Sequence, residues 1–358
     1  MQSIQIPLST QKIHPSGAGS SQERIKTKDS LIGILHVFGC KEEIERYERY
    51  EPLSSPMPVV IVAHGFLSTM NSPTVQSILS ALSHEFERKL SKGGKGNPKI
   101  LGVFVFDFEG NGQSNGMWRF SPYLRDVSNL RTVVNYFRAP ERASFFRVVS
   151  LVGHSQAAND VILYASKYDG DVPIVVAVAP RYEMSKGWQQ YFTKDQIETI
   201  LATKKNFDTD AIIEDWKMPN AKKSTKGRTV YVADVNRRMA LDMRSVAANI
   251  QQTQVIVIHG TQDEVIPFQG SVDMYAQSLH NMNKLTRSSG GKFLLNNPHQ
   301  LVAIPLGNHT FFSSTTTSSG GGKLTPKETK QLTVQALFKQ IIAKIVVNRI
   351  LAPTKAKL

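Results

Sequence analysis

The fold of this chain is decided by the stretch Val148-Val149-Ser150-Leu151-Val152-Gly153-His154-Ser155-Gln156-Ala157. Its apolar first half predicts a buried strand, and the apolar residues that recur at helical spacing from Ala157 to Ala165 predict a helix. Between the two, Ser155 stands on a sharp turn, which requires small residues two positions before and two positions after it. Gly153 meets that requirement, and Ala157 departs from the preferred glycine by one methyl group. The stretch therefore predicts a strand, a strained turn and a helix that together expose a serine as a nucleophile.

The composition is that of a globular protein. The chain has 358 residues, of which 41% are hydrophobic, enough for one large core or two modest ones. Its apolar runs fall short of the roughly 20 residues that span a bilayer, and residues 1–7 lack the features of a secretory signal, so we expect a soluble protein without integral membrane contact. The single cysteine, Cys40, excludes an internal disulfide and suits a reducing compartment.

The charge is strongly positive. Forty-three basic and 29 acidic residues give a net charge of +14, which can attract nucleic acid, an anionic membrane or an anionic small molecule. The basic clusters, at residues 88–95 and 222–228, are short and accompany no zinc, helix-turn-helix or aromatic stacking signature. We therefore interpret them as solvated loops and expect no nucleic-acid partner.

Strands and helices alternate along most of the chain. Short, continuous apolar runs predict strands that are buried on both faces, at Leu31–Phe38, Val59–Ala63, Ile100–Phe106, Val148–Val152, Ile174–Val178, Val255–Ile258 and Leu301–Ile304. Helical patterns lie between most of them, opening at Ser72-Pro73 and covering Leu124–Tyr136, Met239–Ile250 and Val272–Met282. A capping box at Thr325–Glu328 opens a last, core-packing helix that extends to Leu351. This alternation predicts a doubly wound, mostly parallel sheet covered by helices on both sides.

A serine hydroxyl becomes a nucleophile when a base lies within hydrogen-bond reach and a carboxylate holds that base. Asp263 follows the strand Val255–Ile258 and His309 follows the strand Leu301–Ile304, so both are expected at the carboxyl edge of the sheet. The chain order Ser155, Asp263, His309 is one in which such triads occur. We therefore take these three residues as the candidate catalytic triad.

Other residues fit the triad less well. Glu183 follows the strand Ile174–Val178 and remains the alternative acid, whereas Asp107 follows a strand but precedes the serine. The other candidate bases lie inside a predicted helix, before a strand, or directly beside the serine: His280, His299 and His154.

An oxyanion that develops on the substrate needs two preorganised N–H donors. One is the backbone NH of Gln156, the residue after the serine. The second is expected after the strand Val59–Ala63, where Gly65 lets the chain bend so that the NH of Phe66 faces the serine. We interpret the adjacent His64 as a structural hydrogen-bonding residue.

Six motifs in a fixed order carry a resemblance to a known family. They are His64-Gly65-Phe66, Asp107-Phe108-Glu109-Gly110-Asn111-Gly112-Gln113-Ser114, Gly153-His154-Ser155, Arg181-Tyr182-Glu183 ending in Gly187, Gly260-Thr261-Gln262-Asp263 with Val265-Ile266-Pro267, and Gly307-Asn308-His309. From about Leu31 to Leu351 the chain resembles α/β-hydrolases of the serine esterase group that includes monoglyceride lipases and cinnamoyl (feruloyl) esterases. It departs from their pattern at Glu109, where an arginine is common, at Ala157, and in the inserts Thr286–Pro298 and Ser313–Lys323.

The resemblance implies a mostly parallel, eight-stranded sheet with a cap inserted over the active site. The domains expected are a first core part at residues 31–181, the cap at 182–238 and a second core part at 239–352. The polar residues 1–30 are expected to form a flexible N-terminal arm with one strand near Ile4–Leu8, and 353–358 an exposed tail. Four aromatic residues of the cap either line an acyl or aryl pocket or pack the cap against the core: Trp188, Tyr191, Phe192 and Trp216.

Two shorter signals concern cofactor and location. Gly110-Asn111-Gly112 followed by Gly116 is similar to a dinucleotide loop, but its third glycine stands one position late, so we interpret it as a turn. The last residues, Ala356-Lys357-Leu358, are a conservative variant of the serine-lysine-leucine peroxisomal address. We therefore expect the peroxisomal import receptor as a partner and a peroxisome-type organelle as the location in a eukaryote, and the cytoplasm otherwise.

Together these features predict a serine hydrolase that cleaves a small-molecule carboxylic ester through an acyl-enzyme, with an aromatic or short-to-medium acyl group. Such chemistry needs no metal or redox cofactor. Two alternatives remain open. One is an acyl-coenzyme A thioesterase, which the positive charge favours, and the other is a ligand-binding protein whose triad does not turn over.

Overall fold

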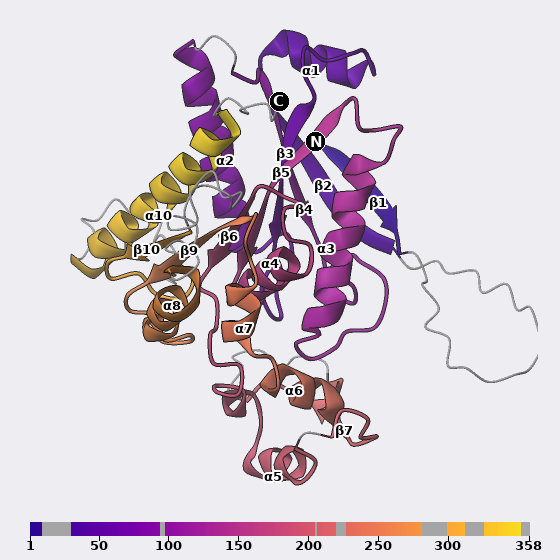
Figure 1. Cartoon of the computed structure of the whole chain (residues 1–358), viewed down its shortest axis with the longest axis vertical. Coiled ribbons are helices and arrows are strands. Elements are labelled where there is room, and N and C mark those ends of the chain that lie inside the picture. Colours follow the sequence, from indigo (N-terminus) through magenta and orange to yellow (C-terminus); the bar gives the residue numbers. More distant parts are fainter. Residues whose placement is uncertain are drawn as a thin grey trace, which may run out of the picture.

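The computed structural model describes residues 1–8, 30–93, 97–204, 206–219, 227–280, 299–311 and 326–351. Within these residues, eight strands form one sheet in the order β1-β2-β4-β3-β5-β6-β9-β10, with helices on both faces (Figure 1). β2 runs antiparallel to both of its neighbours, and the other neighbouring strands pair in parallel. Their bounds are β1 Gln2–Pro7, β2 Ser30–Gly39, β3 Met57–Ala63, β4 Ile100–Phe106, β5 Phe146–His154, β6 Ile174–Val178, β9 Gln254–Gly260 and β10 Gln300–Ile304. The predicted eight-stranded, mostly parallel sheet is confirmed.

The central strands are apolar on both faces because helices cover both faces. All residues of β3 are buried, and they alternate, so that Val59 and Ile61 belong to one core and Val60 and Val62 to the other. Figure 1 shows the helices that lie on either side of the sheet. The first core is covered by α3 Tyr123–Arg138, α4 Gln156–Lys167 and α7 Met243–Ala248, and the second by α2 Pro73–Ser91 and α10 Pro326–Leu351.

Two predicted helix features are confirmed. The Ser72 side chain accepts a hydrogen bond from the Val75 NH and Pro73 is the first residue of α2, as the sequence signal predicted. The last helix packs on the core through Phe338, whose ring stacks on Phe311 with centroids 4.3 Å apart.

The strand expected in the N-terminal arm is present, and it is an edge strand of the large sheet. Gln2–Pro7 form β1, which pairs with β2 from Gln2 opposite Leu35 to Pro7 opposite Ser30. Ile4 and Ile6 are buried, whereas the residues beside them are exposed. This alternation fits an edge strand with one buried face, and it starts two residues before the strand expected near Ile4–Leu8.

Several helices also differ from the prediction. The expected helix Met239–Ile250 is shorter and corresponds to α7, because the Asp242 side chain accepts hydrogen bonds from the backbone of Arg244 and Ser245 and so caps the helix there. A separate helix, α6 Val232–Met239, precedes it. The expected helix Val272–Met282 begins earlier, as α8 Phe268–Met274, and continues through a π-turn at Tyr275–Leu279. A helix that was not predicted, α1 Lys41–Glu48, follows β2.

The residues between β6 and α7 form a small unit that lies beyond one edge of the sheet, at the bottom of Figure 1. We call residues 182–239 the cap segment. It contains a two-stranded antiparallel sheet and its own hydrophobic core. Its elements are the 3₁₀ turn Gln189–Tyr191, α5 Lys194–Ala202, β7 Ile212–Trp216, β8 Arg228–Tyr231 and α6. No helix of the described chain is both long and apolar enough to cross a membrane.

Candidate active site

Ser155 stands between β5 and α4 in a strained backbone conformation. Its φ of 58° and ψ of −116° lie outside the regions that non-glycine residues favour, which costs about 1–3 kcal/mol. The helix passes so close over the strand that a Cβ atom on Gly153 would lie 2.0 Å from the carbonyl oxygen of Ala157. The local geometry predicted from the sequence is therefore present, and it explains why residue 153 has no side chain.

The structure brings Ser155, His309 and Asp263 into one hydrogen-bonded chain. His309 Nε2 lies 2.9 Å from Ser155 Oγ, and His309 Nδ1 lies 2.8 Å from Asp263 Oδ2. The loops after β9 and β10 that carry the acid and the base pack tightly, since a Cβ on Gly260 would lie 2.2 Å from the carbonyl oxygen of Gly307. A serine, an imidazole and a carboxylate in this order can transfer the serine proton to the imidazole.

Asp263 is held as a carboxylate. Its Oδ1 accepts hydrogen bonds from the backbone NH groups of Val265 and Ile266, and its Oδ2 lies against His259 and His309. Burial opposes ionisation of this carboxyl, but the hydrogen bonds of the two histidines outweigh burial, and the pKa of Asp263 is lowered far below its ordinary value. The carboxylate can therefore stabilise a positive charge on His309.

His259, which was not predicted, also contacts Asp263. Its Nε2 lies 3.0 Å from Asp263 Oδ2 and 2.9 Å from the Ile266 carbonyl oxygen, both of which accept, so this nitrogen carries the proton. Its Nδ1 lies 2.6 Å from Ser271 Oγ. His259 is the penultimate residue of β9 and stands four positions before Asp263, and this spacing was the signal available in the sequence.

His154 supports the backbone of His309. Its Nε2 lies 2.9 Å from the carbonyl oxygen of His309, to which it can only donate. Burial, followed by the nearby His309, lowers the pKa of His154 to about 4, so the ring is neutral at physiological pH. His154 thus fixes the loop that carries His309.

His64 orients the peptide group that carries the NH of Phe66. His64 Nε2 accepts a hydrogen bond from the NH of Phe108 at 3.1 Å, so the proton is on Nδ1, which donates to the Gly65 carbonyl oxygen at 2.9 Å. Burial lowers the pKa of His64. Because a trans peptide holds its C=O and N–H in opposite directions, this hydrogen bond also fixes the direction of the Phe66 NH. A Cβ on Gly65 would lie 3.0 Å from the Cβ of Ser155, which shows how close this loop comes to the serine.

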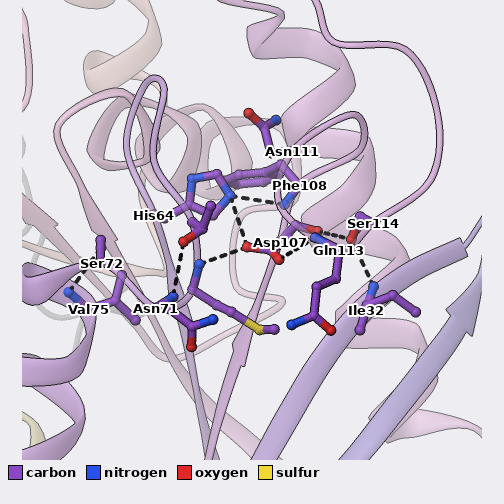
Figure 2. A network of polar contacts seen from close by, with 12 residues as sticks. Ile32, His64, Asn71, Ser72, Val75, Asp107, Phe108, Asn111, Gln113 and Ser114 are labelled. Carbon is purple, nitrogen blue, oxygen red and sulfur yellow. Dashed lines mark hydrogen bonds and ion pairs between the residues drawn. The ribbon is translucent and has the colours of Figure 1, made fainter. Parts of the chain in front are cut away.

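Asp107 anchors the same loop from the neighbouring strand. Its carboxylate joins the loop that contains Met70 to the loop that contains Gln113 (Figure 2). Oδ1 accepts a hydrogen bond from the Met70 NH at 2.7 Å, and Oδ2 accepts one from the Gln113 NH at 2.8 Å. Gly112 has a φ of 51°, and a Cβ there would lie 2.0 Å from Asp107 Oδ2. Gly112 is therefore required by the turn. This agrees with the interpretation of the glycine-containing loop as a turn and not as a dinucleotide loop.

A pair of buried carboxyl groups lies beside Gln156. Asp126 of α3 accepts a hydrogen bond from the Gln156 side chain at 2.7 Å through Oδ2, and Asp160 of α4 is also buried. Among the described residues neither Asp126 Oδ1 nor either Asp160 oxygen has a hydrogen-bond partner. Burial raises the pKa of Asp126 to about 7, and burial together with Asp126 raises the pKa of Asp160 well above its ordinary value.

The alternative acid and bases are not brought to Ser155. The Glu183 side chain is more than half exposed and pairs with Lys186 at 2.8 Å. His299 precedes β10 and accepts a hydrogen bond from the Val255 NH, and His280 lies at the end of a helix. The geometry therefore favours Asp263 over Glu183 as the partner of His309.

Three of the four aromatic cap residues proposed to bind substrate are buried in the core of the cap segment: Trp188, Phe192 and Trp216. Tyr191 is half-buried, and its carbonyl oxygen accepts a hydrogen bond from Trp216 Nε1 at 2.7 Å. The ring of Phe66 packs against this cluster, 5.2 Å from Tyr191 and 6.4 Å from Trp216. Of the two interpretations, the structure supports packing of the cap on the core, and a role in substrate binding stays a prediction.

Three expectations fall on residues outside the described ones. The tail Ala356-Lys357-Leu358, the insert Thr286–Pro298 and the insert Ser313–Lys323 all lie there. The targeting prediction stays a prediction.

One protein-family model matches the chain. The model of the family described as serine aminopeptidase, S33, matches residues 99–291, more than half of the chain. The chain belongs to this family. The match includes Ser155 and Asp263 but starts after Phe66 and ends before His309, so the roles of those two residues depend on the geometry. No curated protein matches the sequence significantly.

Solved structures of esterases and lipases share the fold. Est1E from Butyrivibrio proteoclasticus, with ferulic acid bound, is 15% identical with a TM-score of 0.52, over 89% of this chain and 96% of that one. The Paleococcus ferrophilus monoacylglycerol lipase is 14% identical with a TM-score of 0.54, over 88% and 99%. A putative hydrolase from Agrobacterium vitis S4 is 15% identical with a TM-score of 0.53, over 95% and 98%. This member of the serine aminopeptidase family thus has the α/β-hydrolase fold, in agreement with the resemblance found in the sequence.

Proposed function

We propose that this serine hydrolase cleaves carboxylic esters through an acyl-enzyme formed on Ser155. The observation that carries the proposal is the hydrogen-bonded chain from Ser155 through His309 to Asp263, with contacts of 2.9 and 2.8 Å. The strained turn at Ser155 and the depressed pKa of Asp263 support it, because both features prepare the residues for this chemistry.

The reaction follows from these contacts. His309 Nε2 takes the proton of Ser155 as Oγ attacks the ester carbonyl carbon, and Asp263 stabilises the resulting imidazolium. The backbone NH groups of Phe66 and Gln156 bind the oxyanion. The carbonyl re-forms as the C–O bond breaks and the alcohol leaves with the proton from His309. Water then attacks the acyl carbonyl carbon as His309 takes its proton. The bond from this carbon to Ser155 Oγ breaks, His309 returns the proton to Oγ, and the acid leaves.

An ester substrate with an aromatic or short-to-medium acyl group is the best supported class. The aromatic rings of the cap segment pack around Phe66, one residue of the proposed oxyanion hole, so an apolar group of the substrate would meet an aromatic surface there. The Butyrivibrio esterase with bound ferulic acid and the Paleococcus monoacylglycerol lipase have the same fold, and their names describe ester chemistry.

A substrate panel tests the proposal. We expect the purified chain to hydrolyse p-nitrophenyl acyl esters or methyl hydroxycinnamates, and Ser155→Ala to lose about a million-fold in kcat while remaining folded by circular dichroism. Amino-acid p-nitroanilides test the peptidase activity that the family description names. Cleavage of the anilides without cleavage of any ester would contradict the proposal.

A further inference from the structure

A cavity of about 520 Å³ lies between the segment 109–125 and helix α6 of the cap segment. Its volume is within the range of small-molecule binding sites. Four arginines and two carboxylates line it: Arg119, Arg125, Arg237, Arg238, Glu109 and Asp234. The cavity therefore has more positive than negative side chains.

The two carboxylates are already engaged by three of the arginines. Asp234 pairs with Arg119 through two contacts of 2.6 and 2.9 Å and with Arg237 at 3.4 Å. Glu109 pairs with Arg125 at 3.3 Å. No acidic side chain that lines the cavity is left for the fourth arginine.

Arg238 is the arginine without an acidic partner. Its side chain is almost fully buried, with 3% of its surface exposed, and its Nη1 has no hydrogen-bond partner among the described residues. Its Nη2 reaches the Lys186 carbonyl oxygen at 3.3 Å. A second buried arginine, Arg181, lies near it, and burial together with Arg238 lowers the pKa of Arg181. A buried guanidinium is unfavourable unless an anion pairs with it.

We propose that this cavity binds an oxyanion group, a phosphate or a carboxylate, with Arg238 at its base and Arg237 at its exposed side. Guanidinium groups bind both anions through paired N–H donors. The site adjoins the proposed active site, because Arg119 and Pro122 also line the small crevice that Gly65, Phe66 and Gln156 line. If the proposed esterase function holds, the substrate is therefore an ester or thioester that also carries an anionic group.

Binding is tested without catalysis. Isothermal titration of the Ser155→Ala protein with pyrophosphate and with succinate, at low salt, should show binding of at least one of the two anions. Arg238→Gln and Arg237→Gln, each made in the Ser155→Ala protein, should weaken that binding about tenfold or more, because each removes a charged hydrogen bond. Arg237 is 45% exposed, so its variant keeps the test valid if Arg238→Gln fails to fold. The control is Arg49→Gln in the same protein, which removes an arginine that is 63% exposed and lies next to α1.

Two matched substrate pairs identify the source of the anion. A comparison of kcat/KM for butyryl-coenzyme A and S-butyryl-N-acetylcysteamine tests whether the cavity recognises phosphate. The same comparison for mono-p-nitrophenyl succinate and p-nitrophenyl butyrate tests whether it recognises a carboxylate. We expect one anionic member to have the higher kcat/KM, and this preference to fall about tenfold in Arg237→Gln but not in Arg49→Gln. It should also fall as salt is raised.

The outcomes separate this inference from the proposed function. If the arginine variants weaken anion binding but no substrate is hydrolysed, the proposal of an anion site is supported and the proposed esterase function is contradicted. The inference is overturned if neither anion binds, or if Arg237→Gln and Arg238→Gln bind as tightly as Arg49→Gln, whether or not neutral esters are cleaved.

Discussion

Replacing Asp126 by asparagine should stabilise the protein, and more so as the pH rises. Asp126 is buried, and burial, only partly offset by Arg125 and the hydrogen bond from Gln156, raises its pKa to about 7 from an ordinary value of 3.8. Asparagine has nearly the same shape and keeps a carbonyl oxygen that can accept the Gln156 hydrogen bond, but it never ionises.

The magnitude follows from the two pKa values. Below about pH 4 both the folded and the unfolded chain hold the proton, and the carboxyl costs nothing through ionisation. Between about pH 4 and pH 7 the unfolded chain releases the proton while the folded chain keeps it, so stability falls as the pH rises. Above pH 7 the full cost remains, about 4 kcal/mol at 1.36 kcal/mol per pKa unit. The gain of Asp126→Asn over the wild type should grow by about 3 kcal/mol between pH 5 and pH 8.

Urea denaturation at pH 5, 6.5 and 8, followed by circular dichroism, measures this gain. The control is Asp208→Asn, which removes one negative charge from an exposed position and should give a difference that changes little with pH. A gain for Asp126→Asn that is equal at the three pH values, or a loss of stability at pH 8, would refute the account of a carboxyl that burial keeps protonated.

Three further predictions concern the site. Asp263→Asn should lower kcat in an ester assay about ten thousand-fold, because the His309 imidazole loses its enforced tautomer. Glu183→Gln should keep the wild-type kcat, and the reverse result would show that the acid is misassigned. His64→Ala should lower kcat by about a hundred-fold with little change in KM, because the Phe66 NH is no longer oriented, and an unchanged kcat would contradict that role. The pKa of His154 is about 4 in the folded chain, so as the pH falls the ring takes up a proton in the unfolded chain before it does so in the folded chain. The free energy of unfolding of the wild type, measured in urea, should therefore fall by up to about 3 kcal/mol relative to that of His154→Gln between pH 6.5 and pH 4. An equal pH dependence in the two proteins would contradict this.

The sequence predicted those features of the fold that depend on local pattern. Continuous apolar runs identified the strands of the sheet, because a strand covered on both faces must be apolar on both faces. The turn at Ser155 was identified because its steric limits act on neighbours within two residues, at Gly153 and Ala157. Edge strand β1 was only partly found, because it has one buried face and its two buried isoleucines give a weak signal.

The remaining parts of the site depend on contacts between distant residues. Asp126 and Gln156 are 30 residues apart, and no spacing in the sequence shows that their side chains meet. Arg238 was overlooked for the same reason, since its burial and its lack of an acidic partner appear only once α6 packs against residues 109–125. The aromatic residues of the cap were found, but whether they face a ligand or one another is set by packing, which composition does not determine.

The most direct test of the central claim is covalent labelling of the serine. A fluorophosphonate probe phosphonylates a serine whose hydroxyl is activated by a histidine, and the labelled peptide can be identified by mass spectrometry. We expect rapid labelling of Ser155 in the wild type, loss of labelling in Ser155→Ala, and strong slowing in His309→Ala. A folded wild-type protein that is not labelled, or that is labelled at another residue, would contradict it.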